Sequence, residues 1–112
     1  MTLSIFRIDL FSKQPYVLKD FYEQVLELKL SYAHPDGNSF EFTIGNIKLV
    51  ISKSVTDVKN RIRICVCTAE YKSYRLALTG RNAEITPTKV KEGRFFFEIK
   101  DPDGNEVAIY QL

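Results

Sequence analysis

The chain has 112 residues, of which 45% are hydrophobic, and a formal net charge of +2. This length suits one domain with its own core, and the small charge without any Lys/Arg run argues against nucleic-acid binding. No apolar stretch is long enough to span a membrane and no signal peptide follows Met1, so we expect a cytoplasmic protein.

The first half of the chain begins with the patterns of one strand and one helix. Leu3–Phe11 alternates, with Phe6, Ile8 and Leu10 on one face, which predicts a half-buried strand. Pro15 suits the first turn of a helix, and the apolar residues after it recur at helical spacing. This stripe consists of Val17, Leu18, Phe21, Tyr22, Val25 and Leu26.

Three further strands complete this half. A short strand is predicted at Leu28–Ala33. Phe40–Ile44 and Ile47–Ser52 then alternate on either side of Gly45-Asn46, which is a two-residue hairpin signal.

The second half shows the same order of elements. Arg61–Cys67 reads as a strand, and Ala69–Leu78 has helical spacing. Glu84–Val90 predicts a weak strand interrupted by proline, which suits the edge of a sheet. Arg94–Tyr110 closes the chain as a hairpin around the turn Asp101–Asn105, whose Pro, Gly, Asp and Asn residues favour a turn.

This internal repeat indicates two similar modules. With the polar stretch Ser54–Asn60 as a linker, the sequence predicts one α+β domain over 1–112. It consists of two βαβββ modules, at approximately 1–54 and 59–112. The aligned pairs are Phe40–Ile44 with Phe95–Ile99, Lys48–Ser52 with Glu106–Tyr110, and Arg7 with Arg61.

The repeat gives the predicted mixed sheet two unlike faces. One face is nearly pure hydrocarbon and should pack against the helices on the outside, where each large side chain contributes roughly 1.5–3 kcal/mol on burial. The opposite face is mostly polar and is either solvated or lines a cavity. The apolar face comprises Phe6, Ile8, Phe40, Phe42, Leu49, Ile62, Ile64, Phe95, Phe97, Val107 and Ile109. The polar face comprises Arg7, Asp9, Glu41, Thr43, Lys48, Val50, Ser52, Arg61, Arg63, Cys65, Phe96, Glu98, Glu106, Ala108 and Tyr110.

Cys65 and Cys67 stand two residues apart on one predicted strand. A disulfide at that spacing would be strained, so free thiols are expected. A nucleophilic cysteine would want a neighbouring histidine, which the sequence does not offer. We therefore expect both cysteines to serve packing or to lie at a rim.

The duplicated βαβββ unit, the first-helix motif Asp20–Leu30 with its Phe21-Tyr22 pair, and the closing turn Asp101–Gly104 together resemble the vicinal oxygen chelate superfamily. This superfamily includes glyoxalase I, bleomycin resistance proteins and extradiol dioxygenases. The resemblance covers essentially the whole chain. It implies two modules whose sheets curl into a shared cup that holds the ligand, and a homodimer.

Enzymes that this chain resembles hold a divalent metal through His or Gln near the start of each half and Glu on the last strand of each half. The matching positions here are Arg7, Val50 (or Lys48, for a shift of one pair), Arg61 and Ala108. None of these carries a usual metal ligand. The only histidine, His34, lies in a predicted turn away from the cup. We therefore expect neither a metal nor another cofactor.

Arg7 and Arg61 would approach each other in the cup if the modules pack about a pseudo-twofold axis. One interpretation is a salt-bridge network in which nearby carboxylates neutralise them. The alternative is that they bind a carboxylate or phosphate of a ligand bidentately. The carboxylates available are Asp9, Glu41, Glu98 and Glu106, and the aromatic residues that could stack on a planar ligand are Tyr32, Phe96 and Tyr110.

The leading hypothesis is a metal-free protein, similar to bleomycin resistance proteins, that sequesters a small anionic or aromatic molecule. The predicted ligand-binding residues are Arg7, Arg61, Glu98, Glu106 and Tyr110. A second hypothesis is an enzyme, either a glyoxalase-type lyase or isomerase with a non-standard site or a metal-free catalyst with Glu98 or Glu106 as its base. A third is a structural domain whose cup is filled by its own side chains.

Overall fold

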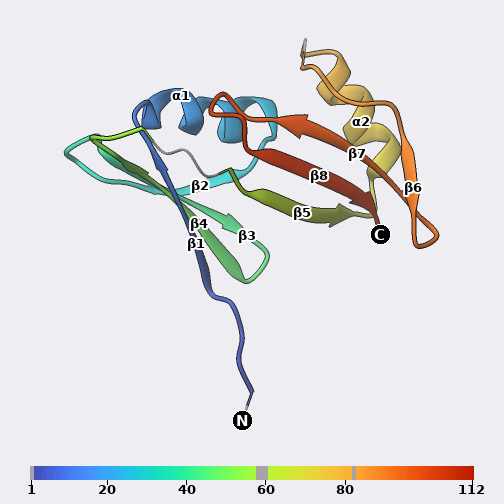
Figure 1. Ribbon diagram of the computed structural model, residues 1–112, viewed down its shortest axis with the longest axis horizontal. Coiled ribbons are helices and arrows are strands. Elements are labelled where there is room, and N and C mark those ends of the chain that lie inside the picture. The colour runs from blue at the N-terminus through green and yellow to red at the C-terminus, as the bar shows by residue number, and fades with distance from the viewer. Residues whose placement is uncertain (1, 58–60, 82) are drawn as a thin grey trace. The chain divides into compact units, whose positions relative to one another are not determined.

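The computed structural model describes residues 2–57, 61–81 and 83–112, and the chain divides into two compact units, Met1–Lys59 and Asn60–Leu112. Each unit runs strand, helix, strand, strand, strand, as the colour gradient of Figure 1 shows. The predicted α+β class and the two βαβββ modules are confirmed. The single domain over 1–112 stays a prediction, and the end of the predicted linker lies outside the described residues.

The first unit contains a four-stranded mixed sheet in the order β1-β4-β3-β2, with β1 parallel to β4 and the other pairs antiparallel. One helix and a π-helical turn pack on its apolar face, where the Tyr22 ring lies 6.2 Å from that of Phe42. The elements are β1 (Arg7–Ser12), α1 (Pro15–Asp20), the π-helical turn η1 (Phe21–Val25), β2 (Lys29–Ala33), β3 (Ser39–Ile44) and β4 (Ile47–Lys53).

Two predictions for the core of this unit are wrong. β1 begins at Arg7 and not at Leu3, so Phe6 lies just before the strand and is 73% exposed. Val17 is also exposed, because the buried side of the first helical turn is formed by Pro15 and Leu18.

The second unit repeats this plan in the order β5-β8-β7-β6, with β5 parallel to β8. Its helix packs on the apolar face, where the Tyr71 ring lies 5.5 Å from that of Phe97. No helix in the described part of the chain is long and apolar enough to cross a membrane. The elements are β5 (Arg63–Thr68), α2 (Tyr71–Thr79), β6 (Lys89–Lys91), β7 (Arg94–Lys100) and β8 (Glu106–Gln111).

Two further residues predicted in the core are exposed. Ile62 precedes β5, and Phe95 lies at the start of β7 opposite Val90 of the edge strand. The weak strand predicted at Glu84–Val90 is reduced to β6, which does lie at the sheet edge, while Ile85 forms only an isolated bridge to β7.

The closing turn is held by its own side chains. Asp101 Oδ1 accepts hydrogen bonds from the backbone N–H groups of Asp103 and Asn105, both at 2.9 Å. Asn105 Nδ2 donates to Asp101 Oδ2 at 2.9 Å, and Asn105 Oδ1 accepts from the Ile62 N–H at 3.0 Å. The turn therefore also fixes the start of β5 against the β7–β8 hairpin.

Candidate functional site

The ladder registers correct the predicted alignment of the repeat. Arg7 pairs with Lys48 in the first sheet, and Arg63 pairs with Glu106 in the second. Since Lys48 corresponds to Glu106, the equivalent of Arg7 is Arg63 and not Arg61. The error of two residues keeps the same face of the strand, because strand side chains alternate with a period of two.

The same registers place the two positions on the last strand of each unit. Val50 pairs with Glu41, and Ala108 pairs with Glu98, so Val50 and Ala108 correspond to each other. The predicted alignment of Phe40–Ile44 with Phe95–Ile99 is likewise shifted by two residues, because the registers match Phe40 to Phe97. Both side chains are buried, Val50 at 6% and Ala108 at 0% exposure, and neither carries a donor atom.

Three of the five predicted site residues share one face of the second sheet. Glu98, Glu106 and Tyr110 lie on this face with Arg63, while Arg7 belongs to the first unit. We call the surface the polar face of the second sheet. Its members are Arg63, Cys65, Cys67, Lys89, Lys91, Arg94, Phe96, Glu98, Lys100, Glu106, Ala108 and Tyr110.

The two predicted arginines are not members of the ion-paired ladders of the second sheet. Arg7 forms a bidentate pair with Asp9, with Nε–Oδ1 at 3.0 Å and Nη2–Oδ2 at 3.2 Å, in agreement with the interpretation that a carboxylate neutralises it. Arg61 precedes β5 and lies over the closing turn, where its Nε would be 3.0 Å from a Cβ added to Gly104. The approach of Arg7 to Arg61 stays a prediction.

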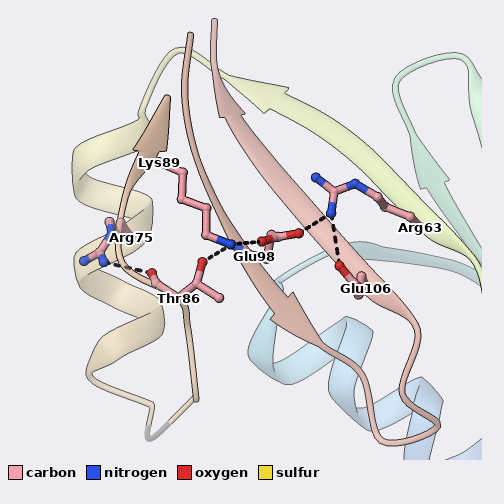
Figure 2. Close-up of polar contacts among 6 residues, drawn as sticks. All are labelled: Arg63, Arg75, Thr86, Lys89, Glu98 and Glu106. Atoms are coloured by element: carbon pink, nitrogen blue, oxygen red, sulfur yellow. Dashed lines mark hydrogen bonds and ion pairs between the residues drawn. The ribbon is translucent and has the colours of Figure 1, made fainter. Parts of the chain in front are cut away.

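An ion-pair cluster of Arg63, Lys89, Glu98 and Glu106 occupies the centre of the polar face. Arg63 Nη1 donates to Glu98 Oε2 and, at 3.0 Å, to Glu106 Oε2, while Lys89 Nζ donates to Glu98 Oε1 at 2.7 Å. Figure 2 shows Glu98 held between Lys89 on one side and Arg63 on the other, with the Arg63 contact reaching across β8.

Ala108 is what allows this crossing. It lies on β8 directly between its ladder partners Cys65 and Glu98, and it is fully buried. A methyl group there leaves room for the Arg63 guanidinium to reach Glu98, whereas a longer side chain would stand in its path. Ala108 thus forms the floor of the cluster beneath the Arg63–Glu98 ion pair, at the position where the metal enzymes that this chain resembles carry a carboxylate.

The backbone of Glu98 is fixed as firmly as its carboxylate. Its N–H donates to Thr86 Oγ1 at 2.8 Å, and the Thr86 N–H donates to the Glu98 carbonyl at 3.0 Å. Arg75 Nη2 from α2 donates to the Thr86 carbonyl at 3.1 Å, as Figure 2 shows. The segment before β6 is therefore anchored to both the helix and the sheet.

The charges of the cluster balance, with two cations and two carboxylates. Hydrogen bonds from Lys89 and then from Arg63 lower the pKa of the Glu98 carboxyl from 4.5 to about 2. The pKa of Arg63 is raised above its ordinary value, chiefly by Glu98, then by the Tyr110 hydroxyl, with a smaller contribution from the Cys65 thiol. Both groups are therefore firmly ionised at neutral pH.

An aromatic stack adjoins the cluster and leads to a cleft. The rings of Phe96 and Tyr110 lie 4.8 Å apart and nearly parallel, at 18°, and the Arg63 guanidinium carbon lies 5.8 Å from the Phe96 ring centroid. Tyr110 also lines an open cleft of about 410 Å³. The residues lining the cleft are Cys65, Val66, Cys67, Lys91, Glu92, Arg94 and Tyr110.

Sequence reasoning placed Arg63 on the polar face without giving it a specific partner, and it missed the roles of Lys89, Lys91 and Arg94. Pairing Arg63 with Glu106 requires the strand register, but Arg94 stands two residues before Phe96, and this spacing already assigned it to the same face. Lys89 and Lys91 flank Val90 in β6, so they share a face as well.

The side chains present do not fit the divalent metal of the enzymes that this chain resembles. Arg63, Val50 and Ala108 offer no N, O or S ligand at the corresponding positions. Among the described residues, no group of three His, Cys, Asp or Glu side chains is close enough to hold a metal ion. The chemistry available on this face is that of fixed charges, an aromatic stack and two thiols.

Solved structures with similar folds are numerous. TnmS3, an antibiotic binding protein from Streptomyces sp. CB03234, is 19% identical with a TM-score of 0.84, covering 99% of this chain and 98% of its own. The lactoylglutathione lyase of Agrobacterium tumefaciens is 17% identical with a TM-score of 0.83, covering 99% and 95%. TioX from Micromonospora sp. ML1 is 15% identical with a TM-score of 0.82, covering 96% and 98%.

No protein-family model matches the sequence, and no curated protein matches it significantly. The likeness to the solved structures therefore concerns the fold, and it spans nearly the full length of both chains in each case. The resemblance that the sequence motifs indicate is confirmed at this level: the chain has the fold of the glyoxalase-type proteins of the vicinal oxygen chelate superfamily.

Proposed function

We propose that this protein binds a small planar molecule with an anionic group, without a metal and without transforming it. The observation that carries the proposal is the cleft of about 410 Å³, in which Tyr110 lies together with the basic side chains of Lys91 and Arg94. That volume is in the range of roughly 300–1,000 Å³ common for small-molecule sites.

The cleft combines the two interactions that such a ligand needs. Tyr110 is stacked on the buried Phe96 ring, so its orientation is set before a ligand arrives. No ion pair to Lys91 or Arg94 is present within the described ranges, and the nearby Glu92 balances only one of the two charges. Arg94 offers a planar fork that suits a carboxylate or phosphate.

The ion-pair cluster has a supporting role in this proposal. Arg63, Lys89, Glu98 and Glu106 neutralise one another, so they add no net charge that would attract a ligand. They hold β5, β6 and β7 at fixed positions around the cleft. The proposal therefore transfers ligand contact from Arg7 and Arg61 to Arg94 and Lys91, while Tyr110 keeps its predicted role.

A metal-free enzyme with Glu98 as general base has little support. A base is most effective when its pKa lies near the working pH, and the pKa of Glu98 is about 2. Binding without catalysis has support from TnmS3, a protein of the same fold described as antibiotic binding.

We infer from the resemblance that this chain is cytoplasmic and forms a homodimer. Light scattering after size-exclusion chromatography would test the dimer.

The experiment is a screen of aromatic carboxylates and phosphates by thermal shift, followed by calorimetry on any compound that stabilises the protein. Tyr110→Leu and Arg94→Gln should each weaken binding about 10–100-fold, since each removes one interaction worth roughly 1.5–3 kcal/mol. Lys29→Gln, an exposed substitution on β2, is the matched control and should leave the affinity unchanged.

Two results would contradict the proposal. If no planar anion raises the melting temperature, the cleft does not serve this class of ligand. If a compound binds but Tyr110→Leu and Arg94→Gln leave its affinity unchanged, its site lies elsewhere on the protein.

A further inference from the structure

Cys65 and Cys67 have a geometric relation that neither the fold nor the proposed function uses. Both are free and exposed thiols on β5, and both line the cleft. They stand two residues apart, so their side chains leave the same face of the strand. Their ladder partners on β8 are Ala108 and Tyr110.

This spacing is wrong for a disulfide but right for an atom placed between the sulfurs. Successive residues on one face of a strand are about 6.6 Å apart, and their Cβ atoms stay at about that distance because they point the same way. A disulfide would need those Cβ atoms at about 3.8 Å. Two thiolates joined linearly through one metal ion need their sulfurs only about 4.6 Å apart, twice a metal–thiolate bond of about 2.3 Å.

We propose that Cys65 and Cys67 form a two-thiolate site for one soft monovalent cation, with Cu(I) as the physiological candidate. Soft thiolates select Cu(I) over hard cations, and a linear ion needs no third ligand. The absence of a three-residue ligand cluster among the described residues is therefore no obstacle. On binding, both S–H protons pass to solvent and two Cu–S bonds form, with no change of oxidation state.

The surroundings suit the charge of the product. Two thiolates around one monovalent cation carry a net charge of −1, which the cleft can balance with nearby cations. Lys91 and Arg94 line the same cleft.

The test is an anaerobic titration of the purified full chain with Cu(I) held by a chromogenic chelator. The wild-type protein should withdraw one Cu(I) per chain, and X-ray absorption at the copper edge should show two sulfur ligands. Cys65→Ser and Cys67→Ser should each lower the affinity for Cu(I), because each removes one of the two ligands. The loss should exceed the roughly 10–100-fold that is typical when a residue supporting a metal ligand is replaced. Both residues are exposed, so the variants should fold, and circular dichroism checks this.

Three results would overturn the proposal. The first is no withdrawal of Cu(I) by the wild-type chain. The second is uptake that survives either cysteine substitution. The third is one Cu(I) per two chains, which would mean that single thiols from separate molecules bridge the ion. The inference is independent of the proposed organic ligand, whose titrations contain no copper, so failure of one leaves the other testable.

Discussion

Replacing Glu98 by Gln tests whether the ion-pair cluster stabilises the second unit. Glu98 accepts from Lys89 and Arg63, and its side chain is only 14% exposed. The variant Glu98→Gln keeps the size of the side chain but removes its charge, and it leaves two cations near each other with one carboxylate fewer. The loss should therefore be electrostatic and should depend on pH.

The size of the effect follows from the pKa of Glu98. A fall from 4.5 to about 2 corresponds to at most about 3.4 kcal/mol, at about 1.36 kcal/mol per pH unit. The raised pKa of Arg63 reflects the same contact and is not counted again. Lys89 is 50% and Arg63 39% exposed, so water screens both partners, and we expect a loss of about 2 kcal/mol near neutral pH.

The sign of the pH dependence is fixed by the direction of the pKa change. The pKa of Glu98 is lower in the folded protein than in the unfolded chain, so its contribution is complete above about pH 4.5. It is lost as the pH falls towards about 2. Urea unfolding of wild type and Glu98→Gln should therefore differ by about 2 kcal/mol near pH 7, and by progressively less at lower pH.

Glu106→Gln is the matched comparison, because Glu106 shares Arg63 as a partner but its side chain is 42% exposed. It should cost less than about 1 kcal/mol. If Glu98→Gln costs as much near pH 3 as near pH 7, the loss comes from packing and the electrostatic account is refuted. A Glu98→Gln protein as stable as wild type at neutral pH would refute the cluster's role altogether.

Three further substitutions, with Gly80→Ala as a control for one of them, test the features around the cluster by urea unfolding. Ala108→Leu should lower stability by about 1–3 kcal/mol, because the larger side chain displaces the guanidinium above it; an unchanged midpoint would contradict the assignment of Ala108 as the floor of the cluster. Asn105→Ala should cost about 1–3 kcal/mol by leaving buried hydrogen-bonding groups unsatisfied, and a smaller loss would mean that water replaces the side chain. Gly104→Ala should destabilise the protein by about 1 kcal/mol or more, since φ is +88° and Arg61 Nε would lie 3.0 Å from the new Cβ. Gly80→Ala is the control: because φ is −67° there, the change should be neutral or stabilising by up to about 1 kcal/mol. Equal effects at the two glycines would refute the argument from backbone conformation.

Much of the fold could be predicted because period and turn chemistry are local properties. The hairpins around Gly45-Asn46 and Asp101–Asn105 formed where the turn residues indicated. The errors lie where a strand begins. Phe6 and Ile62 continue the alternation of β1 and β5, but each stands just outside its strand. A pattern of alternation continues past the last ladder partner, whereas burial does not.

The candidate site was predicted less well because it depends on register between strands. The sequence placed Glu98, Glu106 and Tyr110 on one face, and the ladder registers do bring them together. It could not show that Arg63, and not Arg61, stands opposite Glu106. A helix motif and a turn motif align the two modules only to within two residues. A shift of two residues replaces Arg63 by Arg61 without changing the face of the strand.

The edge strand β6 gives Lys89 a second consequence, which concerns solubility. An edge strand exposes backbone groups that could pair with another molecule, and native proteins discourage this with short edges and lysine. β6 has only three residues, two of them lysines that flank the exposed Val90. Because Lys89 also neutralises Glu98, one side chain links the ion balance of the sheet to its resistance to aggregation. Replacing Lys89 would therefore both destabilise the fold and make β6 more prone to pair with another molecule.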